Sequence, residues 1–163
     1  MEVGSNPIIF LDFDGVVETV YWDFNEDGVL DFNVHKHRHE QLNNKQAIGW
    51  LNELYKHVPY DIVVSSTWRY YMDVDQLQNL LIASGFNPNI KVIGKTPVLY
   101  QQRGFEIEQW IEDNNFSNKF IIIDDDNDMC HLSSYLVRCD CQLGFTIYDY
   151  NKALSMLTGE VRI

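Results

Sequence analysis

The chain has 163 residues, of which 45% are hydrophobic and 22% are charged, a balance typical of one globular domain and not of a disordered segment. The formal net charge is −12, and a surface of this charge repels phosphate backbones, which disfavours nonspecific binding to long nucleic acid. No apolar run approaches the roughly 20 residues needed to span a bilayer, and residues 1–7 lack the basic and apolar segments of a signal peptide. We therefore expect a single cytoplasmic domain over residues 1–163, with no membrane partner.

The first expected element is a strand at residues 8–11, which is apolar throughout and is followed by Asp12, Asp14 and Gly15. In an extended chain, Asp12 and Asp14 lie on the same face. Two like charges placed close together are unfavourable unless a cation or a shared proton offsets them. The glycine lets the backbone turn sharply close to a ligand. This stretch therefore predicts a divalent metal site at the end of a strand.

Residues 18–44 are polar, aromatic and acidic, and we expect them to form a small flap or hairpin insertion over the rim of the sheet. Within this segment, residues 23–31 match the calcium-loop pattern D-x-N-x-D-G, but Val34 stands where the loop needs a bidentate acid. The alternative interpretation is an acidic hairpin turn at residues 27–28. Residues 35–39 alternate three histidines with a lysine and an arginine, either as a solvated face or as a patch that recruits an anionic substrate.

The rest of the chain alternates amphipathic helical patterns with short apolar runs. We expect helices at 46–57, 74–84, 105–115 and 149–157, and strands at 62–64, 90–93, 120–123, 135–138 and 145–148. Apolar strands that alternate with such helices predict an α/β fold, namely a three-layer Rossmann-like parallel sheet with helices on both faces. In such sheets, ligands bind beyond the carboxyl ends of the strands.

Polar side chains follow three of these strands. Asp12 and Asp14 come after the first, Ser65 and Ser66 come after residues 62–64, and the pair at 124–125 comes after residues 120–123. Because the carboxyl ends of parallel strands meet at one edge of a sheet, we expect these groups to share one rim.

The chain contains three cysteines, Cys130, Cys139 and Cys141. An odd number without a signal peptide favours reduced thiols. Cys139 and Cys141 form a C-x-C pair that suits a soft metal, but a tetrahedral zinc site needs about four ligands and no further pair supports one. We therefore expect buried or bystander thiols.

Taken together, these motifs resemble those of the haloacid dehalogenase (HAD) superfamily of hydrolases, in the expected order. Residues 12–16 resemble motif I, D-x-D-G-[TV], Ser65 resembles the Ser/Thr of motif II, and Asp124-Asp125 resembles the DD form of motif IV. Within the superfamily, the chain is similar to the small HAD domains of the Swiss army knife RNA repair group. The stretches that carry this similarity are 65–69, 103–111 and 123–129.

The resemblance implies a division of labour among the acids. Asp12 would be the nucleophile that forms an aspartyl-phosphate, and Asp14 would act first as general acid and then as general base. Mg²⁺ would be the cofactor, held by Asp12, the main-chain carbonyl of Asp14, and Asp125. Asp124 would be a partner of the metal through water.

The resemblance also implies groups that bind the phosphoryl oxygens. Ser65 would donate a hydrogen bond to one of them, and Ser66 and Gly15 would contact the substrate nearby. Arg69 follows motif II and is expected either to pair with a substrate phosphate or to cap the edge of the sheet.

Motif III requires a cation, and two residues are candidates for it. Arg103 stands at the start of the helix that precedes the motif IV strand, and Lys95 lies upstream in Gly94-Lys95-Thr96-Pro97. We favour Arg103, because the superfamily usually places this cation at that helix.

These inferences predict a Mg²⁺-dependent phosphohydrolase with a minimal cap, because residues 15–64 leave little room for one between motifs I and II. An open site of this kind admits a small phosphorylated substrate or a nucleic-acid end. We therefore expect the substrate to be a phosphomonoester. The alternative is a non-catalytic HAD-fold binding or regulatory module.

Overall fold

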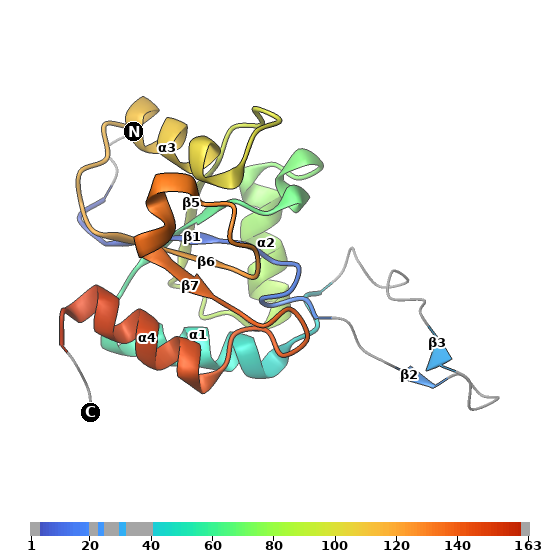
Figure 1. Ribbon diagram of the computed structural model, residues 1–163. Coiled ribbons are helices and arrows are strands. Elements are labelled where there is room, and N and C mark those ends of the chain that lie inside the picture. The colour runs from blue at the N-terminus through green and yellow to red at the C-terminus, as the bar shows by residue number, and fades with distance from the viewer. Residues whose placement is uncertain (1–3, 20–22, 25–29, 32–40, 161–163) are drawn as a thin grey trace.

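The computed structural model describes residues 4–19, 23–24, 30–31 and 41–160. Its centre is a five-stranded parallel sheet with the strand order β5-β4-β1-β6-β7 (Figure 1). The strands are β1 (Ile8–Leu11), β4 (Asp61–Val64), β5 (Lys91–Lys95), β6 (Phe120–Asp124) and β7 (Leu136–Arg138). The strand that carries motif I is therefore the central strand, with the motif II and motif IV strands on either side of it.

Helices cover both faces of this sheet. They are α1 (Lys45–His57), α2 (Val74–Ser84), α3 (Arg103–Asp113) and α4 (Ile147–Thr158), with two short 3₁₀ helices, η1 (Thr67–Tyr70) and η2 (Cys130–Tyr135). In Figure 1, α1 and α4 lie on one side of the sheet and α3 lies on the other. The predicted three-layer α/β architecture is confirmed.

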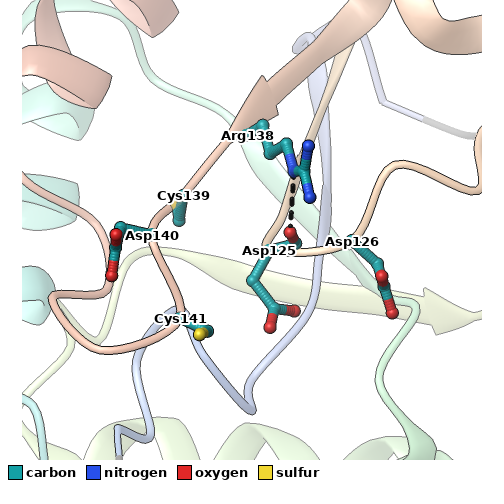
Figure 2. Close-up of a pocket in the computed structure, with 6 residues that line it drawn as sticks. All are labelled: Asp125, Asp126, Arg138, Cys139, Asp140 and Cys141. Atoms are coloured by element: carbon teal, nitrogen blue, oxygen red, sulfur yellow. Dashed lines mark hydrogen bonds between the residues drawn. The ribbon is translucent and has the colours of Figure 1, made fainter.

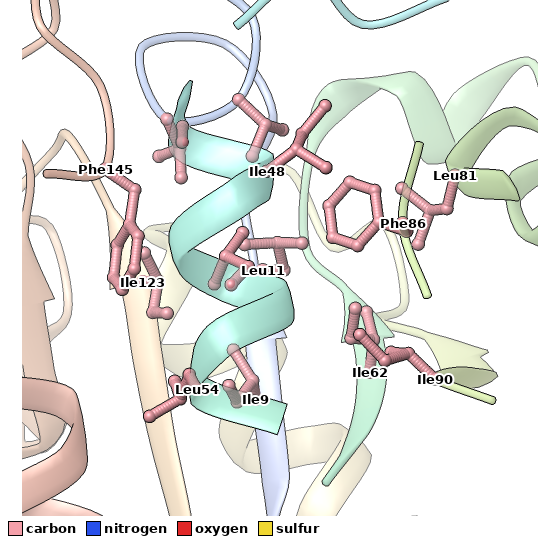
Figure 3. Packing of buried hydrophobic residues seen from close by; sticks show 14 of the residues in the cluster. Ile9, Leu11, Ile48, Leu54, Ile62, Leu81, Phe86, Ile90, Ile123 and Phe145 are labelled. Carbon is pink, nitrogen blue, oxygen red and sulfur yellow. The ribbon is translucent and has the colours of Figure 1, made fainter. Parts of the chain in front are cut away.

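The core has two parts because successive side chains of a strand point to opposite faces. Ile9 and Leu11 of β1 pack with α1, α2 and α4, and Figure 3 shows them beside Ile48 and Leu54 of α1. Ile8 and Phe10 of the same strand pack in a second cluster with α3 and η2. Burial on both faces explains why β1 is apolar at every position.

Several predicted elements differ from the observed ones in their bounds, and one was wrong. The expected strand at 145–148 was wrong, because Thr146 and Asp149 form a capping box that starts α4 at Ile147. Helix α3 begins at Arg103, two residues earlier than residue 105, where it was expected to begin. The backbone N–H of Arg103 donates to Asp128 Oδ2 at 3.1 Å, which satisfies one of the free donors of this first turn.

The segment of residues 18–44 contains a separate antiparallel pair, β2 (Asp23–Phe24) with β3 (Leu30–Asp31). At its base, Thr19 N–H donates to Asn43 Oδ1 at 2.9 Å, and Asn43 Nδ2 donates back to the Thr19 carbonyl at 2.7 Å. Residues 25–29, within the expected calcium loop, and residues 35–39 lie outside the described residues, so both hypotheses stay predictions. Among the helices that the structure describes, none has the length and apolar character needed to cross a membrane.

Candidate active site

The register of the three central strands brings their polar ends together. Leu11 pairs with Val64 of β4 and with Ile123 of β6, so the next residues along each strand are Asp12, Ser65 and Asp124. The backbone continues this register, with Asp12 N–H donating to the Ile123 carbonyl and Ser65 N–H to the Leu11 carbonyl, both at 3.0 Å. The prediction that these strands present their polar groups at one rim is confirmed.

Three carboxylates form the one grouping of potential metal ligands found among the described residues. Oxygens of Asp12, Asp124 and Asp125 lie within 4.8 Å of one another. Asp124 is fully buried and Asp12 is 5% exposed. This group consists of side-chain oxygens, so the expected contact between the metal and the main-chain carbonyl of Asp14 stays a prediction.

This arrangement is electrostatically unfavourable without a cation. Burial raises the pKa of Asp12 to about 6, and burial together with the charge of Asp12 raises the pKa of Asp124 to about 8. Burial also raises the pKa of Asp125 above its ordinary value. Hard carboxylate oxygens are ligands that Mg²⁺ prefers, so the donor set fits that ion, and binding it would favour the ionised form of all three acids.

Arg103 lies beside this group of acids. Its Nη1 is 3.5 Å from Asp12 Oδ1 and 3.3 Å from Asp124 Oδ2, and it also donates to the carbonyl of Ser65. Burial lowers the pKa of the Arg103 guanidinium, but the charges of Asp12 and Asp124 outweigh this and leave the pKa raised. Arg103 is therefore a fixed positive charge at the rim.

Lys95, the other candidate for the motif III cation, points elsewhere. Its Nζ donates to the carbonyls of Arg69 at 3.0 Å and Met72 at 2.8 Å, at the end of the η1 segment. A positive charge at that position satisfies carbonyls that the short helix leaves free. The geometry thus favours Arg103 as the cation next to the acids.

Asp14 and Gly15 form the turn that follows Asp12. Asp14 Oδ2 accepts a hydrogen bond from Trp68 Nε1 at 3.2 Å. Gly15 has φ of +76°, and a Cβ there would stand 2.5 Å from Cγ of Asp125. Only glycine permits both this conformation and this close approach.

The serines of motif II are both fully buried. Among the described residues, the Ser65 hydroxyl has no hydrogen-bond partner, whereas Ser66 Oγ accepts from Trp68 N–H at 3.4 Å. A buried hydroxyl without a partner is unfavourable, and a ligand oxygen beside it would remove that penalty. Ser65 therefore fits the expected contact with a phosphoryl oxygen.

One of the two roles expected for Arg69 was contact with a substrate phosphate, and its position in the structure does not suit that contact. Its side chain is 1% exposed, and its Nη2 lies 2.5 Å from Glu106 Oε2. The guanidinium donates its other hydrogen bonds to main-chain carbonyls. The geometry gives Arg69 a role inside the protein and not on a substrate.

A hollow of about 440 Å³ lies beside Asp125, lined by Asp125, Asp126, Arg138, Cys139, Asp140 and Cys141 (Figure 2). Arg138 Nε donates to the Asp125 carbonyl at 3.0 Å, which ties β7 to the motif IV loop. Cys139 is buried and Cys141 is exposed, and neither belongs to a metal-ligand grouping in the described parts of the chain. The burial of Cys139 agrees with the expectation of a buried thiol, and the role of the other cysteines stays a prediction.

Sequence reasoning missed the partners of three side chains. Trp68 packs in the core and also donates a hydrogen bond to Asp14. Asp128 caps α3, which precedes it in the chain. Glu106 was not singled out, although it falls on the same helical stripe as Ile107 and Trp110. An acid on a buried stripe is the signal that predicts an internal cation.

Comparison with known proteins agrees with this geometry. A family model described as "HAD domain in Swiss Army Knife RNA repair proteins" matches residues 8–150, which include every site residue discussed above. Searches of curated proteins and of solved structures found no match. On the strength of this match over most of its length, the chain belongs to the family of HAD domains in Swiss Army Knife RNA repair proteins.

Proposed function

We propose that this protein is a Mg²⁺-dependent phosphohydrolase that cleaves a phosphomonoester through an aspartyl-phosphate at Asp12. The proposal rests on the group of three carboxylates, with the Arg103 guanidinium against two of them. One strand away lies the Ser65 hydroxyl, which has no hydrogen-bond partner among the described residues. Such a set of groups suits a bound cation and a phosphoryl group side by side.

The metal would be held by Asp12, Asp125 and the main-chain carbonyl of Asp14, and Asp124 would reach it through water. When bound, it would offset the repulsion between the acids and the phosphate and stabilise the charge of the transferring group. Arg103 and the hydroxyl of Ser65 would hold the phosphoryl oxygens. These groups bind and orient the phosphoryl group and take no part in proton transfer.

In the first step, an oxygen of Asp12 would attack phosphorus while the bond from phosphorus to the ester oxygen breaks. Asp14, oriented by Trp68, would give its proton to the departing alkoxide. In the second step, Asp14 would take a proton from water as that water attacks phosphorus. The bond between phosphorus and Asp12 then breaks, releasing inorganic phosphate and restoring both carboxyl groups.

The substrate is proposed only as a phosphomonoester. The family description refers to RNA repair proteins, which makes nucleotides and oligonucleotide terminal phosphates natural candidates. The net charge of −12 opposes extended contact with long nucleic acid, so a small phosphate ester or a strand end is the proposed substrate class.

The test is hydrolysis of a panel with and without Mg²⁺. The panel holds p-nitrophenyl phosphate, nucleotides, and 5′- and 3′-phosphorylated oligonucleotides. We expect Asp12→Asn to abolish turnover and Asp14→Asn to lower it by roughly 100- to 10,000-fold. Because p-nitrophenolate leaves without a proton, Asp14→Asn should also accumulate phosphorylated protein, visible by intact mass.

The matched control is Asp126→Asn, which removes the same charge from an exposed aspartate beside the group of acids. It should stay close to wild type. Equal activity of wild type and Asp12→Asn would refute the mechanism. A wild type that binds Mg²⁺ and phosphate without turning over any substrate would favour the alternative of a binding or regulatory module.

A further inference from the structure

The guanidinium of Arg69 lies in a closed environment behind the motif II serines. It forms an ion pair with Glu106, whose side chain is 4% exposed. Its remaining hydrogen bonds go to the carbonyls of Ser65 at 2.8 Å, Ser66 at 2.9 Å, Thr96 at 3.0 Å and Pro97 at 3.4 Å. One planar side chain therefore joins the end of β4, the end of β5 and helix α3.

Glu106 is also committed on both oxygens. Oε2 pairs with Arg69, and Oε1 accepts the N–H of Leu99 at 2.9 Å. Glu106 lies three residues after Arg103 in α3, and residues at that spacing lie on the same side of a helix. The ion pair therefore fixes the first turn of α3, which carries Arg103, against the loop that carries Ser65.

The carbonyl of Ser65 links the two arginines. It accepts one hydrogen bond from Arg69 Nη1 and another from Arg103 Nη1. Two guanidinium groups that share one acceptor repel each other, and the negative charge of Glu106 offsets this repulsion at Arg69. Arg103 is thereby held by a main-chain carbonyl as well as by the acids.

We propose that Arg69 and Glu106 are positioning residues of the active site, which fix the Ser65–Ser66 segment and the guanidinium of Arg103 for contact with the phosphoryl group. This inference rests on the proposed function, because it assigns the pair a role in that same site. Neither residue touches the substrate.

The geometry suits arginine and no other side chain. Five N–H donors in a rigid plane serve four carbonyls and one carboxylate at once, whereas a lysine ammonium has three donors and no fixed plane. Two of the four carbonyls belong to Thr96 and Pro97 at the end of β5, and the other two belong to the main chain of the two serines. A pair that served stability alone would have no need to converge on these residues.

The experiment compares Arg69→Lys and Glu106→Gln with Tyr60→Phe. Tyr60→Phe also removes a buried hydrogen bond, from Tyr60 to the Leu51 carbonyl at 3.0 Å, but at the start of β4, the end opposite Ser65. All proteins are measured at a temperature at which circular dichroism shows them folded. Three quantities are recorded: kcat and KM for p-nitrophenyl phosphate, affinity for Mg²⁺, and affinity for inorganic phosphate in the presence of Mg²⁺.

We expect both site variants to lose roughly 10- to 100-fold in kcat and to bind inorganic phosphate more weakly. Their affinity for Mg²⁺ should stay within about twofold of wild type, because the hydrogen bonds and ion pair of Arg69 and Glu106 in the described part of the chain involve none of the three clustered aspartates. Tyr60→Phe should keep all three quantities. Glu106→Gln, which keeps the shape and one acceptor for Leu99, should be the milder of the two site variants.

Folded site variants with wild-type kcat and phosphate affinity would overturn the inference, as would a loss shared equally by Tyr60→Phe. A wild type without turnover would contradict the proposed function alone. A crystal structure of Glu106→Gln would then decide the positioning role: a guanidinium of Arg103 displaced from Ser65 and Asp12 supports it, and an unmoved one overturns it.

Discussion

A comparison of Gly15→Ala with Gly159→Ala separates the strain of a left-handed backbone from damage to the metal site. Gly15 has φ of +76°, and Gly159, at the end of α4, has φ of +74°. Alanine in this region costs about 1–2 kcal/mol at either position. The surroundings differ. A Cβ at Gly159 has no neighbour within 4 Å among the described residues, whereas a Cβ at Gly15 would stand 2.5 Å from Cγ and 2.9 Å from Cβ of Asp125.

Real Cβ atoms do not approach other atoms this closely, so Asp125 must move in Gly15→Ala. Both variants should lose roughly 2–8 °C in Tm, from a penalty of about 1–2 kcal/mol in a domain of this size. Only Gly15→Ala should also bind Mg²⁺ more weakly, by roughly 10- to 100-fold, because one of the three acids is displaced.

Isothermal titration calorimetry with Mg²⁺ measures the affinity, and thermal unfolding checks it independently. At a Mg²⁺ concentration of about 100 times Kd, binding adds roughly 2.7 kcal/mol to stability, which raises Tm by roughly 5–11 °C. At the same concentration Gly15→Ala should gain much less than Gly159→Ala. Equal Mg²⁺ affinity in the two variants would refute the assignment of Asp125 to the metal site.

Three further outcomes are expected. Without metal, Tm should fall as pH rises from about 4 to 8, because burial raises the pKa of Asp12 to about 6 and of Asp124 to about 8, so the folded state binds more protons than the unfolded one. Saturating Mg²⁺ should reduce this slope, and a metal-free Tm that is flat over this range would contradict the stated burial of charge. Trp68→Phe should lower kcat by roughly tenfold with little change in Mg²⁺ affinity, because the hydrogen bond that orients Asp14 is lost; unchanged kinetics would exclude that role. Lys95→Met should lose about 1 kcal/mol of stability in denaturant unfolding and keep its phosphatase activity, since its ammonium binds main-chain carbonyls; an inactive, folded variant would return Lys95 to motif III.

Much of the fold was predictable because it depends on local patterns. The apolar run at residues 8–11 and the helical spacing at 74–84 each match an observed element within a residue. The strand expected at 145–148 failed because β-forming residues were weighed above the pair Thr146 and Asp149, whose spacing is that of a capping box.

The candidate site was predictable as far as it follows strand ends. In a parallel sheet, the residue after each central strand must lie at the same edge, so Asp12, Ser65 and Asp124 were identified from sequence order alone. The chemistry proposed for them rests on the family match and stays a prediction.

The sequence by itself thus determined the layers of the fold, the edge at which chemistry is proposed, and the acids that stand there, because these follow from periodicity and chain order. Only the tertiary structure decided which cation meets those acids and which arginine is enclosed. Arg69 and Glu106 are 37 residues apart, and Arg103 reaches the Ser65 carbonyl across 38. Contacts of this kind depend on how a helix packs against a distant loop. A local pattern indicates a buried acid such as Glu106, but it does not say which distant residue pairs with it.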